Sequence, residues 1–262
     1  MYISVDFGGT STRLVASKSL SNPEFIDKPI RRRNTQDYKN DLQFIIDASR
    51  ELSGGQTIDA IGIGFAGRIA PDKRTVEFAN NNRHWEGKPF AEVVEPELGY
   101  PVYLDNDAVA SGLGEAYYGD TPNEFVYLIW GTGIGGTQVK KTDTGAVESA
   151  KAVDWRNLLR TWEEDCGGRA LTQKYGRDSR LLTDAQWDEV FEIFEIRLVE
   201  FCRAVKPENI VLAGGMGIRH AQRIIAAAKN NPALSSIHIK ASIHGEDSGL
   251  YGGFGLIRHN QT

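Results

Sequence analysis

The sequence predicts an α/β protein of two lobes, because one design of glycine-rich β-hairpin occurs in it twice. The first copy spans 2–15, where apolar and polar residues alternate up to Gly8-Gly9 and a second strand follows, the pattern of a half-buried hairpin. The second copy spans 125–139 and repeats the order of apolar run, glycines with threonines, and polar strand. Each hairpin is therefore expected to begin the sheet of one lobe.

The chain length of 262 residues is sufficient for one large or two modest domains. We expect the lobes over 1–118 and 119–262, with the crossing at 119–124. The last helix, over 249–257, belongs to the second lobe by its place in the chain. Whether it packs back on the first lobe is left open.

The first lobe continues after its hairpin with a polar segment, 17–33, that contains Pro23 and Pro29 and is expected to be an irregular edge of the sheet. Gly54-Gly55 stops the helix that follows. The other elements expected in this lobe are a helix over 38–52, strands over 58–65 and 102–104, and a helix over 108–118.

The second lobe continues after its hairpin with an expected loop over 142–154. A long apolar stripe over 187–205 predicts a core helix, which Pro207 ends. The other elements expected in this lobe are a helical stretch over 155–171 broken at Gly167-Gly168, a strand over 209–212, a glycine turn over 213–217, a helix over 219–228 and a strand over 237–240.

The tip of the first hairpin is suited to an anion. Gly8 and Gly9 allow backbone amides to turn inward without a side chain in the way, and the Thr10 hydroxyl is close by. Asp6, just before the turn, is suited to holding Mg²⁺ through water. A plain hairpin turn explains a double glycine equally well, so the tip alone does not decide the function.

The second copy of the hairpin favours the phosphate interpretation. Two phosphate-binding hairpins that face each other across a cleft form the nucleotide site of the two-lobed kinase and ATPase architecture, which includes hexokinase and actin. We therefore expect an actin/hexokinase-like fold, a duplicated ribonuclease H-like unit, with the nucleotide and sugar cleft between its lobes.

Two further polar segments fit such a cleft. The amides of Asn80-Asn81-Asn82 both donate and accept hydrogen bonds, which suits hydroxyl groups of a sugar, although such residues are also common in ordinary loops. Asn106 and Asp107 stand between a strand and a helix, where α/β folds present catalytic groups. An Asp at that place is also a good helix N-cap, and the two interpretations stay open.

Composition excludes several classes of protein. The net charge of -5 and pI near 5.6 count against nucleic acid as the main partner. The two cysteines, Cys166 and Cys202, have no metal-ligand spacing, so we expect no disulfide framework. No signal peptide or membrane span is expected at the N-terminus, and the expected location is the cytoplasm.

Five segments in series resemble the ROK family of sugar kinases, which contains bacterial glucokinases, fructokinases and N-acetylhexosamine kinases. The segments that carry the resemblance are Asp6 to Thr10, Asn81 to Gly87 ending in Trp85-Glu86-Gly87, Asn106-Asp107 with Gly114-Glu115 downstream, Gly131 to Gly136, and Gly214 to Gly217. The match extends over nearly the whole chain in the order of the family.

The resemblance implies an ATP- and Mg²⁺-dependent enzyme in which Asp107 is the general base. Asn81, Asn106 and Glu163 are implied ligands of the sugar hydroxyl groups. The implied nucleotide contacts are Asp6 (through Mg²⁺), Gly8, Gly9 and Thr10 in the first hairpin, Gly131, Thr132, Gly133, Gly135 and Gly136 in the second, and Gly214 with Gly215 at the adenosine end. Family members are often dimers, so a homodimer is included among the expectations.

The sequence also departs from the family. Many members have a Gly-Glu-x-Gly-His segment and a cluster of three cysteines that bind a structural zinc. The corresponding region, 145–168, has no histidine and one cysteine, and because zinc needs about four N or S ligands we expect no zinc site. Glu148 corresponds to the acid of that segment and is included among the expected sugar-binding residues. Ser11 replaces a lysine that frequently follows the first loop threonine.

The leading hypothesis is phosphorylation of glucose, a related hexose or an amino sugar by ATP. Two alternatives keep the same fold: a polyphosphate-dependent glucokinase, and a sugar-binding regulator that has lost transfer activity. The repressors of the family have a helix-turn-helix ahead of the first hairpin, for which the chain leaves no room. A dehydrogenase is disfavoured, because neither hairpin has the G-x-G-x-x-G spacing at a strand-to-helix turn.

Overall fold

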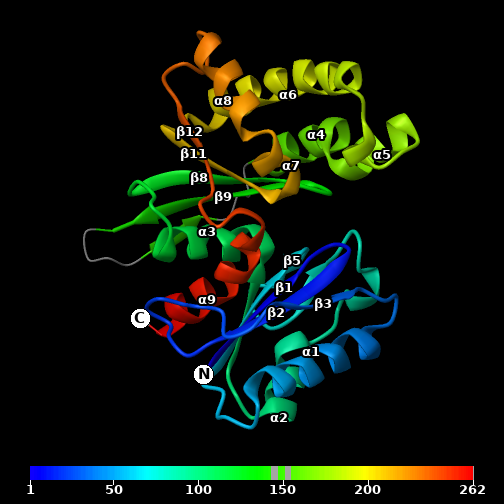
Figure 1. Cartoon of the computed structure of the whole chain (residues 1–262), viewed down its shortest axis with the longest axis vertical. Helices are drawn as coiled ribbons and strands as arrows, with labels where there is room; N and C mark the ends of the chain where they lie inside the picture. The colour runs from blue at the N-terminus through cyan, green and yellow to red at the C-terminus, as the bar shows by residue number, and fades with distance from the viewer. Residues whose placement is uncertain (143–146, 151–154, 262) are drawn as a thin grey trace. The chain divides into compact units, whose positions relative to one another are not determined.

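Two five-stranded mixed sheets with the same strand order form the framework of the protein (Figure 1). The structure, a computed structural model, describes residues 1–142, 147–150 and 155–261. The sheet orders are β3-β2-β1-β4-β7 and β10-β9-β8-β11-β12. In both sheets the central strand pairs antiparallel with the next strand in sequence and parallel with a later one. The predicted α/β fold with two equivalent hairpins is confirmed.

The chain divides into two units, which we describe separately. The first unit consists mainly of residues 1–120 and the segment from 247 onward, and the second of 121–142 and 148–246. The first unit contains β1 (Tyr2–Phe7), β2 (Ser11–Ser17), β3 (Ile30–Arg33), α1 (Tyr38–Ser53), β4 (Ala60–Phe65), β5 (Arg68–Ile69), β6 (Val76–Phe78), α2 (Phe90–Leu98), β7 (Val102–Asn106), α3 (Asp107–Tyr118) and α9 (Ser248–Gln261).

The sheet of the first unit is covered by helices on both faces. Apolar side chains of β1, among them Ile3, Val5 and Phe7, are fully buried in a core with side chains of α1 and α2. Helices α3 and α9 cover the opposite face (Figure 1). Because β4 lies between two parallel neighbours and under helices on both sides, all six of its residues are buried, as is usual for central parallel strands.

Helices α3 and α9 cross at very close range. A Cβ atom added to Gly255 would lie 2.5 Å from the backbone nitrogen of Gly114, and one added to Gly252 would lie 2.8 Å from the backbone of Ala110 and Ser111. These distances leave no space for a side chain. The crossing therefore requires glycine, and it holds the C-terminal helix against the helix that begins at Asp107.

The second unit contains β8 (Glu124–Trp130), β9 (Ile134–Lys141), β10 (Val147–Ala150), α4 (Arg156–Cys166), α5 (Gly168–Tyr175), α6 (Asp184–Val205), β11 (Asn209–Ala213), α7 (Gly214–Arg219), α8 (Ala221–Asn230) and β12 (His238–Ala241). Its core joins one face of β8 to α4, α6 and α8. Trp130 stacks on Phe194 with ring centroids 4.2 Å apart, and Trp162 meets the same ring edge-on.

The structure differs from the expected elements at several places. The expected irregular edge contains a regular strand, β3, and β10 lies within the segment predicted as a loop. Helix α2 was not expected, because Pro89 and Pro96 interrupt the sequence pattern of a helix. The glycine run at 214–217 is not a turn but the first part of α7. Within the described residues, no helix combines the length and apolar composition needed to cross a membrane.

Candidate active site

Asp107 lies at the junction between β7 and α3. Asn106 is the N-cap of α3, and its side-chain oxygen accepts hydrogen bonds from the backbone N–H groups of Ala108 (3.0 Å) and Val109 (3.4 Å). Its side-chain nitrogen donates to Gly67 O and to Asp107 Oδ1, both at 2.8 Å. The alternative in which the acid is itself the cap is therefore wrong for Asp107, and the N-cap is its neighbour.

The Asp107 carboxyl has the properties of a base that works near neutral pH. Burial, and secondly the negative charge of Asp6, raise its pKa from 3.8 to about 7. Its Oδ1 accepts hydrogen bonds from Ala108 N (2.9 Å) and Asn106 Nδ2. Among the described residues no donor binds Oδ2, so this oxygen is available to accept a proton.

Asp6 lies on the same sheet face, at the end of β1. Its Oδ2 accepts two hydrogen bonds from Arg13, at 2.7 and 3.1 Å, and Arg13 also pairs with Asp247 at 3.3 Å. The first turn of α9 closes over the carboxylate, since a Cβ on Gly249 would lie 2.6 Å from its Cγ. Within the described residues no hydrogen bond reaches Oδ1 of Asp6, so this oxygen could accept one from a water molecule on Mg²⁺.

The tip of the first hairpin presents two consecutive donors. The N–H of Gly8 donates to Ser11 O at 3.1 Å. Those of Gly9 and Thr10 have no acceptor in the part of the chain that the structure describes, and successive unpaired N–H groups form an anion-binding concavity. Asn81 packs directly on Gly9: a Cβ atom added to Gly9 would collide with the side-chain amide nitrogen of Asn81.

The tip of the second hairpin also presents two consecutive N–H donors. Gly131 N donates to Gly133 O at 2.9 Å, and Ile134 N donates to Glu163 Oε2 at 2.8 Å. The N–H groups of Thr132 and Gly133 find no acceptor within the described residues. Each hairpin therefore offers two neighbouring donors, the arrangement that forms an anion-binding concavity.

The first two residues of α5 hold the second tip in place. The N–H groups of Gly168 and Arg169 donate to the carbonyl oxygens of Gly131 (2.9 Å) and Thr132 (3.0 Å). Direct hydrogen bonds thus fix the hairpin next to Gly167-Gly168.

In the described residues no group of three His, Cys, Asp or Glu side chains is arranged to hold a metal ion.

The remaining sequence-predicted residues fall at different places. Gly135 and Gly136 lie inside β9, paired with Ile129 and Leu128, and so not at the tip of the hairpin. Gly214 has φ of +78°, and a Cβ on it would lie 2.5 Å from Trp130 O, whereas Gly215 faces open space. Glu148 lies in β10, but its side chain is outside the described residues.

Two residues that sequence reasoning missed contact the first tip. Asn34 Nδ2 donates to Gly8 O at 2.8 Å and Asn82 Nδ2 donates to the same oxygen at 3.3 Å. Asn82 belongs to the run Asn80-Asn81-Asn82, which the sequence placed near a sugar. Its contact with the hairpin tip was not predicted. Nothing in the sequence around Asn34 marks it, because its place depends on the pairing of β3 with β2.

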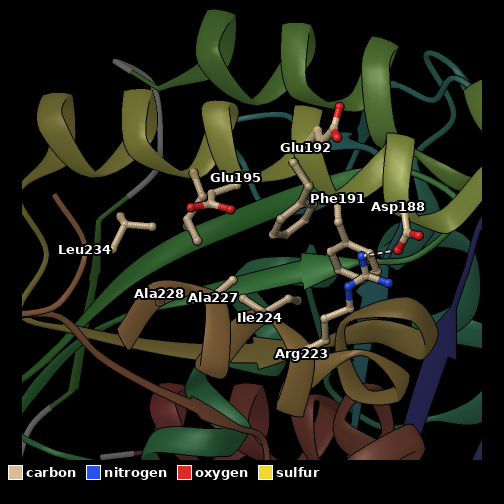
Figure 2. Close-up of a pocket in the computed structure, with 11 residues that line it drawn as sticks. Asp188, Phe191, Glu192, Glu195, Arg223, Ile224, Ala227, Ala228 and Leu234 are labelled. Carbon is tan, nitrogen blue, oxygen red and sulfur yellow. Dashed lines mark hydrogen bonds and ion pairs between the residues drawn. The ribbon is translucent and has the colours of Figure 1, made fainter. Parts of the chain in front are cut away.

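A separate cavity of about 410 Å³ lies in the second unit between α6 and α8 (Figure 2). Figure 2 shows Arg223 paired with Asp188, and its guanidinium lies 3.9 Å from the ring centroid of Phe191. None of the sequence-predicted site residues lines this cavity. It is therefore not the candidate active site.

Comparison with known proteins gives the chain its family. The chain is 28% identical to the xylose repressor of Caldicellulosiruptor bescii over 71% of this chain and 51% of the repressor. It is 33% identical to the glucokinase of Thermotoga maritima over 51% of this chain and 43% of that enzyme. The chain thus spans about half the length of these curated relatives.

The structure resembles a ROK family glucokinase from Streptomyces griseus, solved in complex with glucose and AMPPNP. The TM-score is 0.75, with 21% sequence identity, and the match covers 100% of this chain and 99% of that chain. The fold is therefore the actin/hexokinase-like α/β fold of that enzyme. The ROK family also matches residues 2–146, which is more than half of the sequence. The chain belongs to the ROK family.

Proposed function

We propose that the chain is a sugar kinase that transfers the γ-phosphoryl group of ATP to a hydroxyl group of a hexose or an amino sugar. The observation that carries the proposal is Asp107, a carboxyl with a pKa near 7 and one oxygen without a donor among the described residues. Asp6, which stands just before the tip of the first hairpin in the same unit, acts on Asp107 through its charge. This proximity supports the proposal. Relatives named as glucokinases agree with it.

In the proposed reaction the sugar oxygen forms a bond to the γ-phosphorus while the bond from that phosphorus to the β-bridging oxygen breaks. The proton of the sugar hydroxyl passes to Oδ2 of Asp107, and ADP leaves with the electron pair of the broken bond. The protein needs no covalent intermediate, since phosphoryl transfer depends on positioning and on neutralised charge.

Backbone donors would supply much of that neutralisation. The N–H groups of Gly9 and Thr10, and those of Thr132 and Gly133, are proposed to bind phosphate oxygens. Asp6 would hold Mg²⁺ through water, and the ion would neutralise charge on the phosphates. The adenosine end is proposed to lie at Gly214 and Gly215.

Asn81, Asn106 and Glu163 are proposed to bind the hydroxyl groups of the sugar. The geometry leaves each a different capacity. Asn106 already uses both N–H bonds of its amide on Gly67 and Asp107, and its oxygen accepts from Ala108 N and Val109 N, so a hydroxyl group that donates to this oxygen would replace the longer of these bonds, from Val109 at 3.4 Å. Glu163 accepts from Ile134 N with Oε2, and its other oxygen, which has no donor among the described residues, is proposed to bind the sugar.

The experiment is a panel of hexoses and amino sugars assayed for sugar-dependent ADP formation, with polyphosphate tested in place of ATP. Asp107→Asn should lower kcat by at least about 10²-fold, the usual contribution of a general base. An unchanged kcat would remove Asp107 from the mechanism. No phosphorylated product with any sugar and either donor would refute the kinase proposal.

The second candidate is a sugar-binding regulatory protein without transfer activity. The similarity to a xylose repressor over 71% of this chain is the observation that favours it. It predicts that a sugar raises the melting temperature while no sugar phosphate forms. Detection of product by mass spectrometry decides between the two candidates.

A further inference from the structure

Asn34 occupies a central place beside the first phosphate hairpin. It follows β3 directly, and its backbone N–H donates to Thr10 O at 2.9 Å. Its side-chain oxygen accepts from Thr12 Oγ1 at 2.7 Å, and its nitrogen donates to Gly8 O at 2.8 Å. Since a carbonyl oxygen can only accept, the amide nitrogen must be the atom that faces Gly8, which fixes the orientation of the amide.

Gly8 O receives two amide donors from different parts of the chain. Asn34 Nδ2 approaches it from the end of β3, and Asn82 Nδ2 approaches it at 3.3 Å from the loop before the 3₁₀ turn Arg83–Trp85. The described chain contains no cis peptide bond. In a planar trans peptide the carbonyl and the following N–H point in opposite directions. The two asparagines therefore direct the Gly9 N–H away from themselves.

A peptide between two glycines has little preference of its own for one direction. Without Cβ atoms both orientations of the plane are sterically accessible, so the hairpin sequence alone does not determine which side the Gly9 N–H faces. The tip can bind an anion only while that N–H faces the anion. An external hydrogen bond to Gly8 O is thus a means of fixing the donor.

We infer that Asn34 is a positioning residue, which holds the Gly8–Gly9 peptide with its N–H directed toward a phosphate of the donor. This inference rests on the proposed function in naming the donor phosphate as the ligand. Asn34 does not contact the reacting atoms. It acts through Gly8 O, and Asn82 assists it.

The same contacts join the loop that contains Asn81 and Asn82 to the tip of the first hairpin. Asn34 Nδ2 also lies 3.4 Å from Asn82 Oδ1, and Asn82 is 1% exposed, so the loop cannot shift without disturbing this contact. The far side of the loop is fixed by His84 Nε2, which lies 3.0 Å from Asp41 Oδ2. Asn81, which precedes Asn82 in this loop, packs on Gly9. A sugar that orders this loop should therefore also order the donor site.

The test compares Asn34→Asp with Asn40→Asp. Asn40 is exposed on α1, so the control makes the same change in charge away from the hairpin. In Asn34→Asp the side chain keeps its acceptor for Thr12 but presents a carboxylate to Gly8 O, which then loses the nearer of its two amide donors and keeps only Asn82 at 3.3 Å. Loss of one well-formed hydrogen bond corresponds to about a tenfold change in affinity. We expect the KM for ATP to rise about tenfold, with the KM for sugar changed less than about twofold.

Binding measurements separate this inference from the proposed function. Titration calorimetry with ADP, with and without the sugar, should show about tenfold weaker ADP binding in Asn34→Asp and a smaller effect of the sugar on that binding. The control should match the wild type in both. Asn34→Ala, which adds no charge, is the second variant if the melting temperature shows that Asn34→Asp is unfolded.

Each outcome decides one of the two ideas. If both Asn34 variants are folded and bind ADP as the wild type does, the inference is wrong, whether or not the chain is a kinase. If the wild type binds ADP but phosphorylates no sugar, the proposed function fails while the ADP comparison still tests Asn34. An equal loss of ADP and sugar binding would indicate a merely structural role and would also overturn the inference.

Discussion

Replacing Asp107 with Asn should stabilise the protein above neutral pH while it removes the proposed transfer activity. The pKa of Asp107 is raised from 3.8 to about 7, mainly by burial and secondly by the charge of Asp6. A carboxyl with a raised pKa in the folded state binds its proton more tightly there than in the unfolded chain. Ionising it therefore costs stability, and the cost is present above the folded pKa and is lost as pH falls toward the unfolded one.

The size of the effect follows from the same shift. The difference between 3.8 and about 7 corresponds to at most about 4 kcal/mol at pH 8 and to less than about 1 kcal/mol at pH 4. Asn has the shape of Asp, and its oxygen can keep the hydrogen bonds from Ala108 N and Asn106 Nδ2. The variant therefore removes the charge and leaves the local contacts in place.

The assay is urea-induced unfolding of the wild type and Asp107→Asn at pH 4 to pH 8, followed by far-UV circular dichroism. Tryptophan fluorescence is less suitable, because four of the five tryptophans lie in the second unit and only Trp85 lies in the first. The variant should gain stability over the wild type progressively as pH rises. A variant less stable than the wild type at pH 8, or a difference in stability that does not vary with pH, would refute the conclusion that the ionised Asp107 carboxylate destabilises the folded protein.

Three further predictions concern other features of the two units. The kcat/KM of the proposed kinase should fall about tenfold per pH unit below about pH 7, since Asp107 must be ionised to accept a proton; a profile flat from pH 5 to pH 8 would contradict this. Gly255→Ala should destabilise the protein by roughly 1–3 kcal/mol, because its Cβ would meet Gly114 at 2.5 Å, and Gly215→Ala, which faces open space, is the control in a thermal unfolding experiment. Glu163→Ala should lower stability by roughly 1–3 kcal/mol by leaving a hairpin N–H without its acceptor, while Glu163→Gln should retain most of it; equal losses in the tryptophan fluorescence transition would speak against the hydrogen bond.

The part of the fold that repeats in the sequence was predictable. The alternation before Gly8-Gly9 and the apolar run before Gly131 identified both hairpins, and the two sheets built on them have one strand order. What failed were short elements with weak patterns. Helix α2 contains Pro96, and β10 has only four residues, too few for a periodic pattern to be distinguished from a loop.

The candidate site was predictable as a set of motifs but not as a geometry. The resemblance indicated Asp107, yet its raised pKa depends on burial and on Asp6, which is distant in the sequence. Asn34 was missed because only the register of β3 on β2 places it at the hairpin tip. Gly135 was placed too close to the tip, because a glycine in a strand and a glycine in a turn look alike in one sequence.

The crossing of α9 over α3 has a consequence for how the protein is made. Helix α9 follows the second unit in the chain, so the face of the first sheet that holds Asp6 acquires its cover from Gly249 only after the second unit has been synthesised. Most of the second unit, 148–246, is one stretch of chain that is synthesised before α9 and can fold while the first unit is incomplete, in line with the tendency of domains to fold as units. Completion of the first unit around Asp6 is therefore expected to follow synthesis of the second unit.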